Sequence, residues 1–229
     1  MLIIHDSRLP DEAIRNLQLY GECLSFHTEK ITYEAIAGHP DIFFCPIDGD
    51  IVVALNTPTH FVDCLLARGF NIRKGENFVG GQKYNSTSYN AVVTDQYIIH
   101  NRKYTDPSIL NYLGRRIFMH VNQGYTRCSL FPLKNNNFIT SDKGVEKTLC
   151  HNKINCCYIS CEEILLPGFP YGFLGGCMGG YQNKIFIIGK LEYLSEGAKV
   201  YDFLRKLDYE IIELYDGMLF DGGGLFFLP

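Results

Sequence analysis

The chain has 229 residues, of which 46% are hydrophobic and 20% are charged, and its formal net charge is −4. This composition is typical of a soluble globular protein that buries a sizeable core. The negative charge argues against nucleic acid or an anionic membrane as a partner, because both attract basic surfaces. No apolar run approaches the roughly 20 residues that span a bilayer, and the N-terminus lacks a signal-peptide pattern. We therefore expect a cytoplasmic protein with a single domain, residues 1–229. The sequence does not indicate its oligomeric state.

The nine cysteines are odd in number and scattered, which favours reduced thiols over a disulfide framework. One group combines residues that bind zinc, but its spacing matches no usual zinc motif: Cys150, His151, Cys156, Cys157 and Cys161. The glycine-rich stretch 175–180 lacks the Lys and Ser/Thr that end a phosphate-binding loop. We therefore expect neither a metal nor a cofactor.

The first residues predict a strand at 2–4, a helix that opens near Pro10, and a second strand at 23–26. Proline suits the first helical turn, and the acidic residues that follow it complement the helix N-terminus.

A fuller pattern follows. The apolar runs 42–46 and 51–55 flank Asp48-Gly49-Asp50, a typical hairpin signal. Thr57-Pro58 then predicts a helix start, and 70–72 predicts a strand. The order is strand, strand, helix, strand.

This order recurs three times. The expected strands are 89–93, 97–100 and 117–121 in the next copy, 128–133, 138–140 and 156–160 in the third, and 176–178, 185–188 and 210–214 in the fourth. The helices of the first and last of these copies are predicted to be capped by Asp106 and Ser195.

The apolar run 224–228 needs a partner strand, and the N-terminal strand is the best candidate. The two ends of the chain then share a fifth unit. The expected units are 39–75, 88–121, 127–161, 175–215, and 222–229 together with 1–26. First strands recur about every 40 to 50 residues, a period typical of repeat architectures. We expect an α/β fold with five ββαβ blades in a closed propeller; the alternative is an ordinary open α/β sandwich.

This pattern resembles the pentein fold of the guanidino-modifying enzymes, such as arginine deiminases and amidinotransferases. Asp221-Gly222-Gly223-Gly224 is similar to the glycine run that opens the last unit of those enzymes, two or three residues before their nucleophilic cysteine. Here those positions hold Leu225, Phe226 and Phe227. The non-catalytic ribosome anti-association factor, translation initiation factor six, has the same fold, so the fold does not decide the function.

The resemblance places a central cavity at the starts of the first strands. Polar residues there are the predicted ligand-binding residues for a small molecule: His39, Asp41, Asn90, Arg127, Cys128 and Asp221. Cys177, flanked by glycines whose N–H groups could stabilise an oxyanion, is the candidate nucleophile. His120 is its candidate base, and His39 and Arg127 are the other residues that could activate it. Cys128 is the rival thiol, and only one of Arg127 and Cys128 is expected to face the cavity, because adjacent strand residues point to opposite sides.

Two functions follow from these residues. The first is a cysteine-dependent hydrolase or transferase that acts on a guanidine, amidine or amide. The alternative is a non-catalytic binding protein of the same fold, with Cys177 as a buried structural residue.

Overall fold

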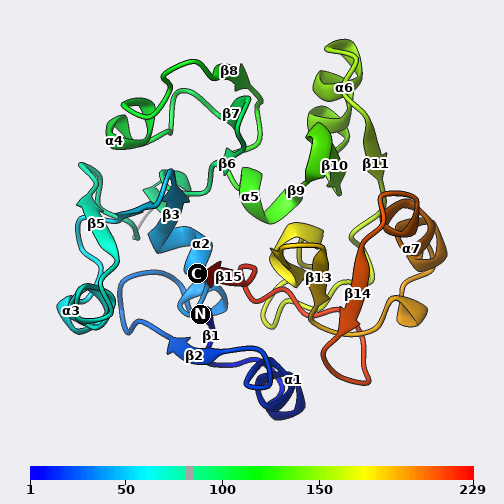
Figure 1. Ribbon diagram of the computed structural model, residues 1–229, viewed down its shortest axis with the longest axis horizontal. Helices are drawn as coiled ribbons and strands as arrows, with labels where there is room; N and C mark the ends of the chain where they lie inside the picture. The colour runs from blue at the N-terminus through cyan, green and yellow to red at the C-terminus, as the bar shows by residue number, and fades with distance from the viewer. Residues whose placement is uncertain (81–84) are drawn as a thin grey trace.

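The protein is described by a computed structural model that covers residues 1–80 and 85–229 (Figure 1). The strands in these described ranges form five three-stranded sheets. In each sheet the middle strand pairs antiparallel with one neighbour and parallel with the other. The sheets are β15 (Phe226–Leu228), β1 (Leu2–Asp6) and β2 (Glu22–Phe26); β3 (Phe44–Ile47), β4 (Asp50–Val53) and β5 (Asn71–Lys74); β6 (Val92–Val93), β7 (Tyr97–His100) and β8 (Ile117–His120); β9 (Leu130–Leu133), β10 (Asn137–Thr140) and β11 (Cys156–Tyr158); and β12 (Met178–Tyr181), β13 (Lys184–Ile187) and β14 (Glu210–Glu213).

The two ends of the chain share one of these sheets. Strand β15 pairs antiparallel with β1, with Ile3 opposite Phe227. The paired residues of both strands are apolar, and the pairing satisfies the backbone groups on the two edges that face each other.

One helix joins the middle and last strands of each sheet: α1 (Asp11–Leu17), α3 (Thr59–Ala67), α4 (Pro107–Leu110), α6 (Lys143–His151) and α7 (Gly197–Lys206). Figure 1 shows these helices at the periphery, whereas β15, β6 and β9 lie toward the middle. Each helix buries one apolar stripe; in α7 the buried side chains are those of Val200 and Leu204. Asp106 caps α4 as expected, whereas Ser195 does not cap α7, because its hydroxyl donates to Glu163.

The first strands begin later than the sequence indicates. Residues that we expected in strands lie in short helical turns before four of them: α2 (Pro40–Phe43), η2 (Asn85–Thr87) with the turn that follows it, α5 (Thr126–Ser129) and η4 (Leu174–Cys177). A continuous apolar run does not distinguish a buried strand from a buried helical turn. The turns bond their own backbone groups where no adjacent strand is available to pair with them.

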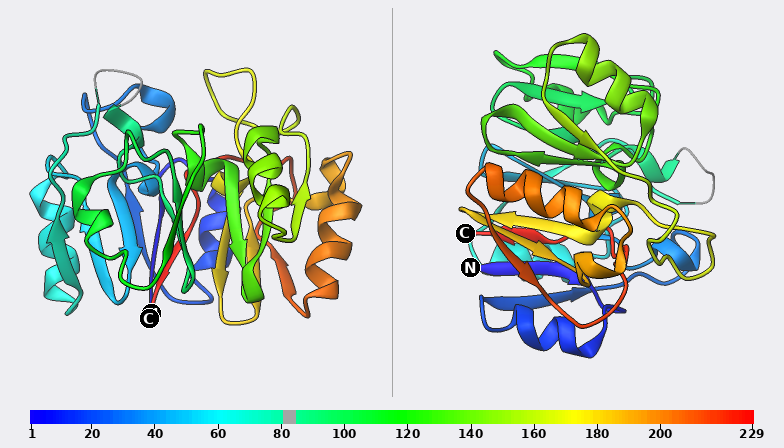
Figure 2. Two further views of the ribbon diagram at one scale, coloured as in Figure 1. Left: turned by 90° about the horizontal axis from the view of Figure 1, so that it is seen from above. Right: turned by 90° about the vertical axis from the view of Figure 1, so that its right-hand side faces the viewer.

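Three further one-turn helices lie in loops: η1 (Glu34–Ile36), η3 (Lys134–Asn136) and η5 (Leu191–Tyr193). The segment with η1, in blue, and the loop before η4, in yellow, rise on the same side of the molecule, opposite the C-terminus (Figure 2). No helix among the described residues is long and apolar enough to cross a membrane.

Candidate active site

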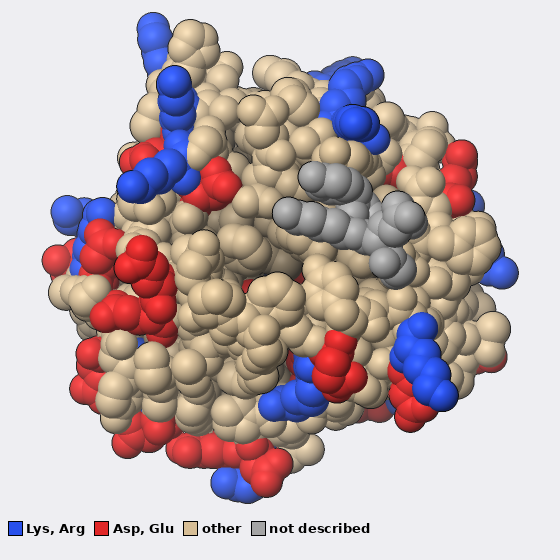
Figure 3. Space-filling view, turned by 180° about the vertical axis from the view of Figure 1, so that it is seen from behind, with Lys and Arg blue, Asp and Glu red and all other residues tan. Residues whose placement is uncertain are grey.

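A cavity of about 410 Å³ opens on the side where these two segments rise. Figure 3 shows that this face is hollowed near its middle, with a little acidic surface visible inside. The lining residues are Tyr33, Ile36, His39, Gln123, Tyr125, Cys128, Leu166, Phe169, Pro170, Tyr171, Phe173 and Asp221.

The repeated architecture explains which residues meet there. Four lining residues each stand five positions before the first residue of the first strand of a sheet: His39, Tyr125, Phe173 and Asp221. Equivalent positions of four units therefore converge on one cavity. The polar members of this set are separated by up to 182 residues along the chain (221 − 39).

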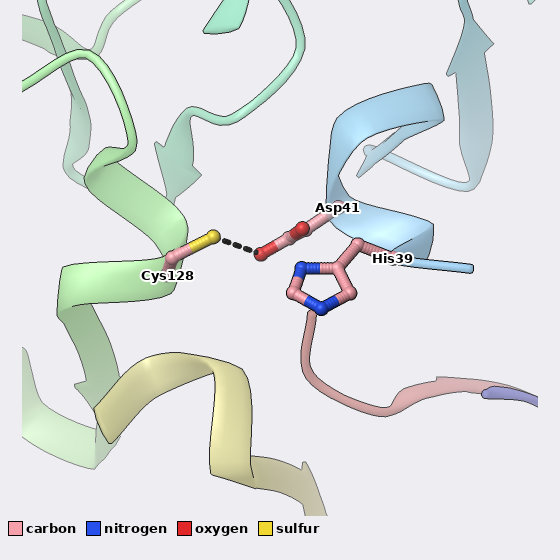
Figure 4. Close-up of side chains that lie close together, drawn as sticks. All are labelled: His39, Asp41 and Cys128. Atoms are coloured by element: carbon pink, nitrogen blue, oxygen red, sulfur yellow. Dashed lines mark hydrogen bonds between the residues drawn. The ribbon is translucent and has the colours of Figure 1, made fainter. Parts of the chain in front are cut away.

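At the inner end of the cavity, Cys128 contacts Asp41 (Figure 4). The Cys128 thiol donates a hydrogen bond of 2.8 Å to Oδ2 of Asp41, and both side chains are buried. Asn90 fixes this pair: its Nδ2 lies 3.3 Å from Cys128 Sγ and 3.1 Å from the Asp41 carbonyl oxygen, and its Oδ1 accepts from the Cys128 N–H. The turn α5 thus presents the thiol, and the turn α2 presents the carboxylate that accepts its hydrogen bond.

His39 completes the cluster. Its Nδ1 lies 3.9 Å from Asp221 Oδ1 and its Nε2 lies 3.9 Å from Asp6 Oδ2, but neither ring nitrogen makes a hydrogen bond. Oδ1 of Asp41 also has no hydrogen-bond partner. Buried polar atoms without partners are rare in folded proteins and point to a site that receives a ligand or a proton.

The environment sets the charge states of this cluster. Burial raises the pKa of Asp41 to about 6 and raises the pKa of the Cys128 thiol well above its usual value. Burial also lowers the pKa of His39 and raises the pKa of Asp221. At pH 7 the resting site therefore contains a protonated thiol, a neutral imidazole and an ionised Asp41.

One atom from each of His39, Asp41 and Cys128 can be chosen so that all three lie within 4.8 Å of one another. Imidazole, carboxylate and thiolate are all zinc ligands, so these residues are the group among the described residues that fits a metal ion. This group differs from the one that combines zinc-binding residue types in the sequence around Cys156.

Arg127 faces away from this cavity. Its Nη1 donates to the Gly175 carbonyl oxygen at 2.9 Å, and its guanidinium lies over Phe131. It lines a second cavity, of about 230 Å³, with Phe226 and Phe227 from the C-terminal strand. Of the adjacent residues Arg127 and Cys128, only the cysteine lines the larger cavity.

The structure does not bring the candidate nucleophile Cys177 and the candidate base His120 together. Cys177 lies in a hydrophobic core cluster, its thiol donates to the Phe173 carbonyl oxygen at 3.3 Å, and burial raises its pKa. His120 is exposed at the end of β8, where its Nδ1 accepts from the Arg102 N–H, and it lines a different surface hollow. Neither residue lines the cavity that contains Cys128.

Sequence reasoning did not single out Asp6, Arg8, Tyr33 or Tyr125. Asp6 is fully buried beside His39 and binds the Arg8 guanidinium at 2.6 Å and 2.9 Å. Its signal in the sequence is an acidic residue two positions after the predicted apolar strand 2–4. Tyr33 and Tyr125 join their hydroxyls at 2.7 Å across 92 residues, a contact that no local pattern reveals.

The model of a "Family of unknown function (DUF6873)" matches residues 4–226. A search of curated proteins by sequence found no match.

Several solved structures are similar in fold. DDAH from Pseudomonas aeruginosa, complexed with citrulline, has a TM-score of 0.60 at 10% identity, over 93% of this chain and 91% of that chain. The agmatine deiminase of C. jejuni has a TM-score of 0.55 at 8% identity, over 93% and 87%. The N-terminal domain of ArgZ, an arginine dihydrolase from cyanobacteria, covalently bound to a reaction intermediate, has a TM-score of 0.57 at 8% identity, over 93% and 90%. The fold is that of the pentein superfamily.

Proposed function

We propose that this chain, which belongs to the DUF6873 family of unknown function and has a pentein fold, is a cysteine-dependent hydrolase or transferase. Its substrate is a guanidine, an amidine or an amide. The observation that carries the proposal is the 2.8 Å contact between Cys128 Sγ and Asp41 Oδ2, beside the unpartnered His39. We also infer that the five sheets close into a five-bladed propeller, because β15 and β1 join the two ends of the chain.

In the proposed reaction, Cys128 Sγ forms a bond to the central carbon of the guanidinium or amidinium group. The thiol proton moves to Asp41, which already accepts its hydrogen bond, and from there to the leaving nitrogen, which departs as an amine or ammonia. Water then attacks the sulfur-bound carbon, His39 takes its proton, and breaking of the C–S bond restores the thiol. If an amine attacks in place of water, the outcome is transfer instead of hydrolysis.

The acidic residues give the reaction its selectivity for a cation. Asp41 and Asp221 are buried, and a guanidinium offers paired N–H donors that suit carboxylate oxygens. A bound cation next to Sγ also favours the thiolate over the thiol, because an adjacent positive charge lowers a thiol pKa. The protonated resting thiol is thereby activated only when the substrate is in place.

The experiment is a turnover screen over guanidines, amidines and amides, with ammonia or amine release as the readout. We expect Cys128→Ser to lose activity by about 1,000-fold or more, whereas Cys177→Ser, a matched change of a buried thiol, retains it. Intact mass spectrometry of a slow substrate should show an adduct on Cys128. Stoichiometric zinc at His39, Asp41 and Cys128 would contradict a thiol nucleophile, and binding without turnover would favour the non-catalytic alternative.

A further inference from the structure

The mouth of the cavity is aromatic. Five of its lining residues carry rings: Tyr33, Tyr125, Phe169, Tyr171 and Phe173. The rings of Tyr33 and Phe169 lie 5.8 Å apart between centroids, although they come from the η1 segment and from the loop before η4. Exposed fractions of 41% for Tyr33, 48% for Phe169 and 45% for Tyr171 leave these rings open to a ligand.

The part of this lining that the structure describes contains no lysine or arginine. The two arginines near the inner end are already engaged: Arg8 holds Asp6, and Arg127 faces the opposite cavity. Arg8 pairs with Asp6, whereas Asp41 and Asp221 have no lysine or arginine partner among the described residues, which favours a cationic ligand. A ligand carboxylate or phosphate would find no countercharge here.

Aromatic faces attract organic cations and also cover apolar groups. Gln123 is the amide side chain in the described lining, and both of its polar atoms are already hydrogen-bonded. Its Nε2 donates to Asp142, and its Oε1 accepts from the Tyr125 N–H. The mouth therefore offers a ligand ring faces and phenol groups. The inner end offers the Asp221 carboxylate and the Cys128 thiol, with Asp41 directly behind the thiol. A volume of about 410 Å³ lies within the range of small-molecule sites.

We propose that the cavity selects a guanidine or amidine that carries an aromatic or branched alkyl group and no carboxylate. The cationic group lies against Asp41, Cys128 and Asp221, and the apolar group lies among Tyr33, Phe169 and Tyr171. This inference rests on the proposed function, from which it takes the guanidine or amidine group.

The test is equilibrium binding to the Cys128→Ala variant, which cannot react, by calorimetry with four probes. Benzylguanidine carries both features, methylguanidine lacks the apolar group, arginine adds a carboxylate, and benzoate reverses the charge. We expect benzylguanidine to bind at least about tenfold more tightly than methylguanidine or arginine, and benzoate not to bind. Turnover by the unmodified protein is measured separately, so loss of the catalytic proposal and loss of this selectivity are distinguishable.

A matched pair of variants locates the apolar group. Tyr171→Ser in the Cys128→Ala protein should weaken benzylguanidine binding by about threefold to tenfold and leave methylguanidine binding unchanged. Tyr201→Ser removes a similarly exposed tyrosine from α7, outside the cavity, and should change neither. Equal affinity for arginine and benzylguanidine, or binding of none of the guanidines, would overturn the inference.

Discussion

The thiol of Cys128 donates to Asp41 from the turn before β9, while Asp41 lies in the turn before β3. Both turns stand at the start of the first strand of a sheet, and 87 positions separate the two residues in sequence. The acidic partner is unusual because burial raises its pKa to about 6. A carboxylate in this position costs stability in the free protein, which suggests that it serves a ligand.

The first prediction concerns this cost. Because the pKa of Asp41 rises from 3.8 to about 6 on folding, the folded protein binds more protons between these values, and this group lowers stability as pH rises through them. We expect Asp41→Asn to raise the free energy of unfolding at pH 7.5 by up to about 3 kcal/mol and to abolish turnover. Urea unfolding at pH 7.5 and 3.5 measures this, and the gain should vanish at the lower pH. A variant less stable than the parent at pH 7.5 would contradict the prediction.

The second prediction concerns the reactivity of the thiols. The cationic electrophile 2-chloroacetamidine should alkylate Cys128 at least about tenfold faster than neutral 2-chloroacetamide does, because carboxylates surround this thiol. Cys150 is exposed and is the internal control, with similar rates for both reagents. Peptide mass spectrometry resolves the two sites. Faster labelling of Cys177 than of Cys128 would contradict the prediction and would support Cys177 as the nucleophile.

A third prediction uses two glycines with similar backbone conformations. Gly223 has φ of +69°, and an added Cβ would lie 2.4 Å from the Cβ atom of His39; Gly49 has φ of +80° and open space around it. Gly49→Ala should cost about 1 kcal/mol of stability and leave turnover unchanged. Gly223→Ala should cost more and also reduce turnover, since His39 must move. The melting temperature measures the loss of stability, and initial rates measure the loss of turnover. Equal turnover in the two variants would refute the assigned role of His39.

The fourth prediction concerns Asp106, a buried carboxylate that joins two segments. It accepts hydrogen bonds from the N–H groups of Ser108 at 2.9 Å, Asn77 at 2.8 Å and Glu76 at 3.0 Å, and from the Tyr89 hydroxyl at 2.9 Å. Asp106→Ala leaves several buried donors without an acceptor and should destabilise the fold by about 3 kcal/mol or more. Urea unfolding measures the loss.

Its control is the capping residue Asp142, which accepts from the Val145 N–H and from Gln123 Nε2 at 2.8 Å each. Asp142→Ala should cost only about 1 kcal/mol, because its surroundings are partly open to water. Similar losses in the two variants would show that Asp106 acts as a helix cap alone.

The repeating order of strand, strand, helix and strand was readable from the sequence, because it depends on local patterns. The Asp-Gly hairpin signal at Asp48 and the apolar stripe of the helix at 197–206 are examples. The apolar run at 224–228 likewise required a partner strand, and β15 does pair with β1. Asp221, His39 and Asp41 stood out as polar residues beside apolar runs.

Which cysteine faces the cavity was decided only by the tertiary structure. Cys128 stands two residues before the first residue of β9, and Cys177 stands one residue before that of β12. Successive side chains are rotated by about 100° in the α-helical turn of Cys128 and by about 120° in the 3-10 turn of Cys177. The different positions in these turns direct Cys128 toward Asp41 and Cys177 into the core. The sequence does not predict these orientations, because the runs 128–133 and 176–178 both indicate continuous strands. Packing of the five sheets against one another sets them.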